Sequence, residues 1–186
     1  EPHSPRRSGR GMRATAATQA GSVAVVMGVD PGLASTGYAV IAGTPSRMEV
    51  LALGTLRTSS GAAHPERLRR IHDEVAALAR AHPVEAAAVE AWFVHPVSRS
   101  AMAMAEARGA IMVALAGAGV EVAEYAPNTI KQAVTGQGGA DKAQVRAMVR
   151  RLAGAEPGSD HAADALAAAI CHLSSARLRG AIRRAR

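Results

Sequence analysis

The apolar and polar residues of the chain first mark out three short strands. An uninterrupted apolar run at 23–29 ends at Asp30 and predicts a buried strand. A second apolar run follows at 37–42, and 48–57 places apolar residues at alternate positions along one side. Because only short links separate the three segments, they predict an antiparallel meander.

Helices and strands then alternate along the rest of the chain. The apolar residues of 64–81 recur every three or four positions and predict a helix that ends before Pro83. Short apolar runs at 84–89 and 120–124 predict two further strands. Later segments predict more helices, at 98–117, from Pro127 to about 134, at 141–152 and at 159–175.

This order of elements predicts an α/β fold, a mixed five-stranded sheet flanked by helices. We expect one domain at 23–175, because neither an internal repeat nor a second boundary is visible. Residues 1–22 are rich in Arg, Ser, Gly and Ala and predict a disordered basic tail. Residues 176–186 predict a second basic tail at the C-terminus.

The positive charge of the chain is concentrated at its two ends. The net charge is +7, of which 1–22 contribute +3 and 176–186 contribute +5, leaving −1 for the body. Basic ends of this kind indicate a polyanionic partner, although solvated tails that only improve solubility have the same composition. The charge therefore allows nucleic-acid binding without proving it.

Cysteine content and hydropathy bear on the compartment. Cys171 is the only cysteine, so the chain forms no internal disulfide, which fits a reducing cytoplasm. No uninterrupted apolar stretch reaches 18 residues, and we expect no transmembrane helix. These features predict a cytoplasmic protein without a membrane partner.

Polar residues at the ends of predicted elements suggest a metal site. Asp30 ends the first strand and Glu90 follows the fourth, so the two carboxylates meet if these strands are parallel neighbours. His161 and Asp164 share one face of the last helix. Oxygen ligands with one imidazole suit Mg²⁺ or Mn²⁺. The alternatives are a turn-capping Asp30 and a helix start that simply favours acids.

Five segments, in order, resemble RuvC-type Holliday junction resolvases (crossover junction endodeoxyribonucleases). They cover about residues 23–175 in one register. They are VMGVDPGLASTGYAVI at 26–41, AVEAWF at 88–93, EARG at 106–109, YAPNTIKQAVTGQGGADKAQV at 125–145 and HAADALAAAICH at 161–172. The opening segment alone is weak, because similar turns occur in sugar kinases and actin-like ATPases, but all five in order are specific.

The resemblance implies an RNase H-like fold, a homodimer and metal-dependent cleavage of four-way DNA junctions in recombination and repair. It also implies Mg²⁺ or Mn²⁺ as cofactor, with two ions per site, and the branch-migration proteins RuvA and RuvB as partners. Asp30, Glu90, His161 and Asp164 match the catalytic, metal-binding positions of the family. Many members carry Asp where this chain has His161, so the neighbouring Asp160 stays open as the alternative ligand.

Three further residues match DNA-binding positions of the family. Lys131 and Lys142, the only lysines, are expected to position phosphates, and the alternative is two solvated side chains. Phe93 matches an inserted aromatic that unstacks a base near the crossover. An adjacent pair such as Trp92 and Phe93 otherwise packs in a core, and Trp92 fits that role better.

The helix at 98–117 is apolar nearly all round, which suggests a subunit interface on its second side. A wholly internal helix is the alternative. Three other functions remain open at this point. They are a YqgF-type RNase H-like nuclease acting on RNA precursors, a non-catalytic junction-binding module and, least favoured, an actin-like ATPase.

Overall fold

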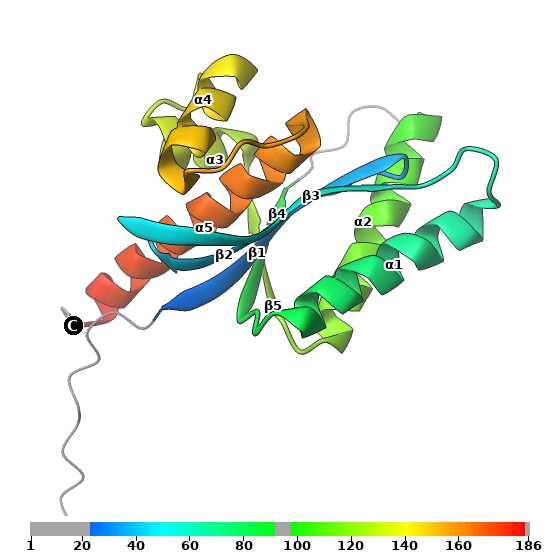
Figure 1. The fold of residues 1–186 in the computed structure, drawn as a ribbon, viewed down its shortest axis with the longest axis horizontal. Helices are drawn as coiled ribbons and strands as arrows, with labels where there is room; N and C mark the ends of the chain where they lie inside the picture. The colour runs from blue at the N-terminus through cyan, green and yellow to red at the C-terminus, as the bar shows by residue number, and fades with distance from the viewer. Residues whose placement is uncertain (1–22, 92–97, 185–186) are drawn as a thin grey trace, which may run out of the picture.

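A computed structural model describes residues 23–91 and 98–184, which form one sheet with helices on both faces (Figure 1). The strands are β1 (Ala24–Asp30), β2 (Ser35–Thr44), β3 (Arg47–Arg57), β4 (Ala86–Glu90) and β5 (Glu121–Tyr125). The helices are α1 (His64–Ala81), α2 (Arg99–Gly117), α3 (Pro127–Thr135), α4 (Lys142–Ala153) and α5 (Asp160–Arg184). The predicted α/β class with a mixed five-stranded sheet is confirmed.

The sheet has the strand order β3-β2-β1-β4-β5. The first three strands form the predicted antiparallel meander, and β4 and β5 both run parallel to β1. Four predicted bounds were wrong by two residues or more, among them the end of β2 at Thr44 instead of 42 and the start of β4 at Ala86 instead of 84. β2 begins at Ser35 instead of residue 37, because Ser35 and Thr36 still pair with the end of β3. The helical backbone of α5 continues to Arg184 instead of ending at 175.

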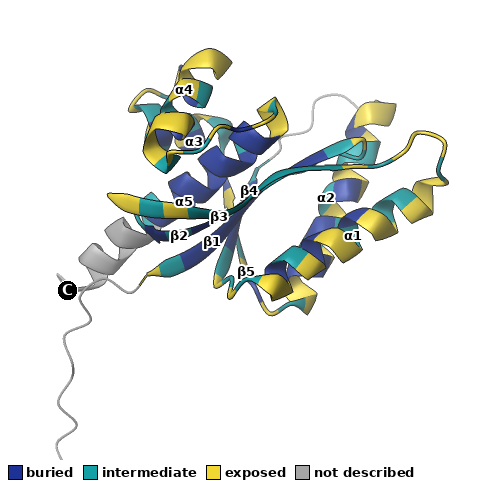
Figure 2. Ribbon diagram, viewed as in Figure 1, coloured by how far each residue is buried: buried dark blue, intermediate teal, exposed yellow. Residues whose placement is uncertain are grey.

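Two groups of helices cover the two faces of the sheet (Figures 1 and 2). Val25, Met27 and Val29 of β1 pack with residues of α1 and α2. Val26 lies on the opposite face, in a core with residues of α3, α4 and α5. Because strand side chains alternate between faces, Gly28 and Asp30 point to the α5 side together with Val26. By the same alternation, Glu90 points to that side with Ala88.

Two glycines allow α5 to lie directly on the sheet. A Cβ at Gly28 of β1 would overlap the carbonyl oxygen of Ala165, and one at Gly37 of β2 would overlap that of His161. The first half of α5 is itself rich in alanine, and Ala162 and Ala165 are fully buried. Small residues on both surfaces therefore bring the helix backbone against β1 and β2.

The strand register fixes which strand ends lie side by side. Val29 of β1 is paired with Val89 of β4, so Asp30 and Glu90 follow at adjacent positions on neighbouring parallel strands. The start of α5 packs against the same end of the sheet. The backbone carbonyl of His161 faces Gly37, and Gly37 pairs with Asp30. The fold thus gathers the C-termini of β1 and β4 and the N-terminus of α5. No helix within the described ranges is long and apolar enough to cross a membrane.

Candidate metal and nucleic-acid site

Asp30 and His161 are in direct contact at this end of the sheet. Nδ1 of His161 lies 2.6 Å from Oδ2 of Asp30, within hydrogen-bond distance. The Asp30 side chain is only 19% exposed, whereas that of His161 is 47% exposed. Burial raises the pKa of Asp30, and the His161 hydrogen bond and positive charge lower it in part. A strand end and a helix start thus place a carboxylate and an imidazole together.

The loop that follows Asp30 is fixed by hydroxyl groups from two strand ends. Thr36, a fully buried residue, donates to the carbonyl of Gly32 at 2.7 Å. Thr58, just beyond β3, donates to the carbonyl of Leu33 and in turn accepts a hydrogen bond from Nε of Arg67 at 2.9 Å. These contacts hold the turn that presents Asp30. The sequence analysis did not find them, because no motif marks Thr58 or Arg67.

Glu90 and Asp164 complete a cluster of three interacting carboxyl groups. Burial raises the pKa of Glu90, and the negative charges of Asp30 and Asp164 raise it further. Burial likewise raises the pKa of Asp164, and the charge of Asp30 adds to the effect. The three groups therefore repel one another when ionised, which is the electrostatic condition that favours a bound cation.

The two lysines line the same site. Lys131 of α3 and Lys142 at the start of α4 border a pocket of ≈ 320 Å³ that Glu90 and Asp164 also line. Both lysine charges lower the pKa of Glu90, and Lys142 also lowers the pKa of Asp30 and Asp164. The glycine-containing link between α3 and α4 thus turns the chain so that both cations lie beside the carboxylates.

The donor set of this cluster fits a hard divalent cation. Asp30, Glu90 and Asp164 offer carboxylate oxygens, and His161 offers an imidazole, which Mn²⁺ accepts more readily than Mg²⁺ does. Among residues 23–91 and 98–184, however, no three His, Cys, Asp or Glu side chains stand in a group that could hold a metal ion. The backbone brings the four residues to one rim, but their side-chain donor atoms do not converge on a single metal position.

Two of the predicted residues need separate comment. Asp160, the alternative ligand, is exposed and pairs with Arg146 of α4, whereas its neighbour His161 contacts Asp30. Phe93 lies outside the described residues, as does Trp92, so their predicted roles at the junction remain predictions.

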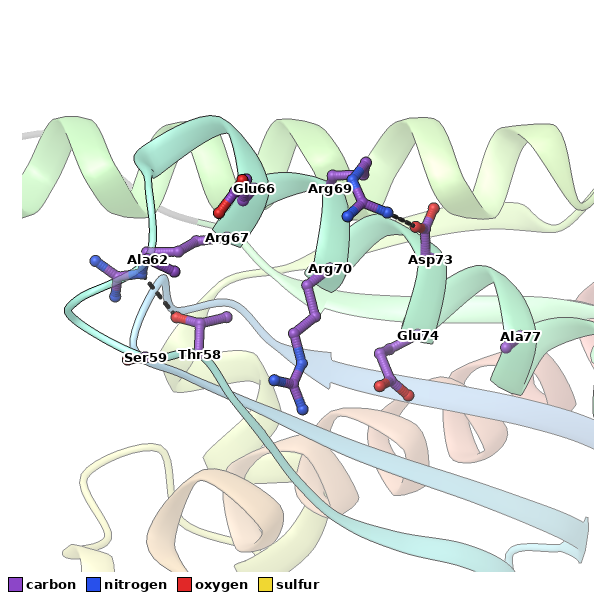
Figure 3. A pocket seen from close by; sticks show the side chains of 10 residues that line it. All are labelled: Thr58, Ser59, Ala62, Glu66, Arg67, Arg69, Arg70, Asp73, Glu74 and Ala77. Atoms are coloured by element: carbon purple, nitrogen blue, oxygen red, sulfur yellow. Dashed lines mark hydrogen bonds and ion pairs between the residues drawn. The ribbon is translucent and has the colours of Figure 1, made fainter.

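A second and larger pocket lies elsewhere, between the loop after β3 and helix α1 (Figure 3). It measures ≈ 540 Å³ and is lined by Arg67, Arg69 and Arg70, which Glu66, Asp73 and Glu74 match in charge. Figure 3 shows Arg69 paired with Asp73 and Arg67 turned toward Thr58. This balance of charge gives the pocket no preference for an anion, so we place the chemistry at the carboxylate cluster.

Comparison with known proteins identifies a family. A family model described as "Crossover junction endodeoxyribonuclease RuvC" matches residues 26–172. The protein of that name from Syntrophomonas wolfei is 44% identical over 155 residues, covering 82% of this chain and 90% of the relative. The one from Alkalilimnicola ehrlichii is 45% identical over 162 residues, covering 86% and 97%.

Solved structures agree with the sequence comparison. The fold resembles that of Thermus thermophilus RuvC in complex with a Holliday junction substrate, with a TM-score of 0.79 and 37% identity over 84% of this chain and 96% of that one. A second T. thermophilus RuvC structure gives a TM-score of 0.77 at 38% identity, covering 83% and 96%.

Proposed function

Because the chain belongs to the RuvC family of crossover junction endodeoxyribonucleases, we propose that the rim formed by Asp30, Glu90, His161 and Asp164 is its catalytic site. The chain is an endodeoxyribonuclease with an RNase H-like fold that binds and resolves Holliday junctions in recombination and repair. One observation carries the assignment of the site. Burial and the charge of Asp30 of β1 raise the pKa of Glu90 of β4 and of Asp164 of α5, at a rim that two lysines also line.

The four rim residues would hold the divalent metal on which cleavage depends. Asp30, Glu90 and Asp164 would supply carboxylate oxygens to the metal, for which we propose two ions per site. Bound there, Mg²⁺ or Mn²⁺ would activate a water and stabilise the charge that develops on the scissile phosphate. We propose His161 rather than Asp160 as the fourth donor, because His161 contacts Asp30 and Asp160 pairs with Arg146.

The remaining residues of the site act on the DNA. Lys131 and Lys142 lie beside the carboxylates and would bind the phosphates next to the scissile bond, bringing an anion to an otherwise repulsive rim. His161 holds Asp30 in one orientation through its Nδ1 contact. Phe93 would unstack a base at the crossover. The match of Phe93 to the family's inserted aromatic supports this role.

The proposal extends to a homodimer, in which two sites cut opposed strands. Met102 and Val113 on α2 are large apolar side chains that are 55% and 63% exposed. Their position on a helix rich in small residues supports a two-fold contact through α2. Partnership with RuvA and RuvB and a cytoplasmic setting are part of the same proposal and rest on family membership.

The substrate class can be tested by incubating the protein with a synthetic four-way junction, a linear duplex and a structured RNA precursor. Each incubation contains Mg²⁺, Mn²⁺ or EDTA, and nicks are mapped at nucleotide resolution. We expect paired nicks at symmetric positions in the junction alone, and none in EDTA. Preferential RNA cleavage would indicate the YqgF-type activity instead. Binding of the junction without cleavage in either metal would indicate a non-catalytic module.

A further inference from the structure

Arg146 connects helix α4 to the first turn of α5. Its Nη1 donates to Oδ1 of Asp160 at 3.2 Å, and its Nη2 donates to Oε1 of Glu156 at 3.2 Å and to the carbonyl of Pro157 at 2.7 Å. These acceptors lie along the short link between the helices and on the first residue of α5. One planar guanidinium thus fixes three points of this link, which an ammonium with its point charge cannot reproduce.

Both ends of this connection carry residues of the proposed site. Lys142 is four residues before Arg146 on α4, and therefore lies on the same helix face. His161 and Asp164 lie in the first two turns of α5, directly after Asp160. The link and the turn have further attachments: Ser159 lies 2.6 Å from Thr55 of β3, His161 contacts Asp30 of β1, and Arg150 pairs with Glu156. Arg146 thus joins the helix that begins with Lys142 to the first residue of α5.

We propose that Arg146 is a positioning residue for cleavage, which holds the first turn of α5 so that His161 and Asp164 face Asp30 while Asp160 is held outside the site. This inference rests on the proposed function of the rim. The Arg146 side chain is 38% exposed and its acidic partners are more so, and such ion pairs contribute little to global stability. Its effect should therefore appear in catalysis, where small misplacements of reacting groups are costly.

The test compares Arg146→Ala with Arg150→Ala, a matched control. Arg150 is one turn further along α4 and also pairs with Glu156, but it makes no described contact with Pro157 or Asp160. For each variant we would measure single-turnover junction cleavage, junction Kd with its salt dependence in EDTA, and Mn²⁺ affinity of the DNA-free protein by electron paramagnetic resonance. Circular dichroism reports whether each variant folds.

For Arg146→Ala we expect cleavage to fall on the order of 10-fold or more. Junction Kd should stay within about two-fold with an unchanged salt slope, and Mn²⁺ should bind several-fold more weakly. Arg150→Ala should match the wild type in all three measurements. Arg146→Lys keeps the charge without the fork and should be intermediate. If Arg146→Ala does not fold, full activity of Arg146→Lys would by itself overturn the proposal.

Other results would contradict it directly. A weaker Kd with a salt slope flattened by about one unit would make Arg146 a phosphate contact instead. Unchanged cleavage, unchanged Mn²⁺ affinity, or an equal loss in Arg150→Ala would also overturn it. Asp30→Asn, measured alongside, separates the two proposals. If Asp30→Asn is inactive and Arg146→Ala is fully active, only the positioning role fails. If Asp30→Asn cleaves like the wild type, the proposed rim itself fails.

Discussion

The carboxyl groups at the rim repel one another in the metal-free protein, which fits the proposed cation site and disfavours stability. Glu90 is partly buried and faces the charges of Asp30 and Asp164, so its pKa is raised in the folded state. The folded protein therefore binds the Glu90 proton more tightly than the unfolded chain does. Protonated Glu90 therefore stabilises the fold below its ordinary pKa, about 4. This stability is lost as the pH rises through the raised pKa of the folded state.

Glu90→Gln should accordingly stabilise the metal-free protein at pH 7 while abolishing cleavage. We expect the Tm to rise by about 1–3 °C, because solvent screens part of the repulsion. Below about pH 4 the gain should disappear, since the wild-type group is then protonated. Thermal unfolding in EDTA at both pH values checks this. An equal gain at both pH values would show that packing, and not charge, limits stability at this site.

The two lysines and Phe93 should have different physical signatures. Lys131→Ala removes a proposed phosphate contact, so junction binding should weaken and its log–log salt slope should flatten by about one unit. Phe93→Ala is the comparison variant, because loss of a stacking residue leaves the salt slope unchanged. Fluorescence anisotropy at several salt concentrations measures both. A slope that Lys131→Ala leaves unaltered would mean that Lys131 only balances the charge of Glu90.

The contact between α5 and the sheet depends on residues without functional groups. Gly28→Ala would place a methyl group against the carbonyl of Ala165, so the helix must shift or the strand must bend. We expect a loss of about 1–3 kcal/mol in the free energy of unfolding, with a larger relative loss of cleavage. Gly139→Ala is the control, because nothing lies within 4 Å of a Cβ there. Chemical denaturation measures both, and equal stabilities would contradict tight packing at Gly28.

Most elements were predictable because their signals are local. The helix at 64–81 was predicted with its observed bounds, since apolar spacing and Pro83 are both visible in the sequence. The proposed meeting of Asp30 and Glu90 required β1 and β4 to be parallel neighbours, and the structure meets this condition. The extra length of α5 was missed, because the basic residues after 175 resemble a solvated tail.

Contacts between distant segments were predictable only in part. Positions at element ends already suggested that Asp30, Glu90, His161 and Asp164 form one site, and the resemblance matched the same four residues. The register and the packing of α5 bring them to one rim. Neither argument indicated that Lys131 and Lys142 line the same pocket as the carboxylates. Arg146 was missed altogether, because its partners follow an irregular link whose course no periodicity predicts.

At the level of the assembly, the exposed apolar residues of α2 give a direct prediction. Val113→Asp would place a charge in the proposed two-fold interface twice, once from each subunit, so the dimer should dissociate. Light scattering coupled to size exclusion measures the mass, and we expect about 19 kDa per particle in place of twice that value. Ala77→Asp on α1, an exposed position on another helix, is the control. A monomeric wild type, or a variant that remains dimeric, would contradict the α2 interface.

The whole molecule is a scaffold that brings one strand-end carboxylate against a helix-borne imidazole, and Asp30→Asn tests this most directly. Single-turnover cleavage of a synthetic four-way junction should be lost at saturating Mg²⁺ or Mn²⁺, because a proposed metal donor is gone. Junction affinity in EDTA should stay within about two-fold of the wild type, because Asp30 binds no phosphate. Undiminished nicking by Asp30→Asn would contradict the account.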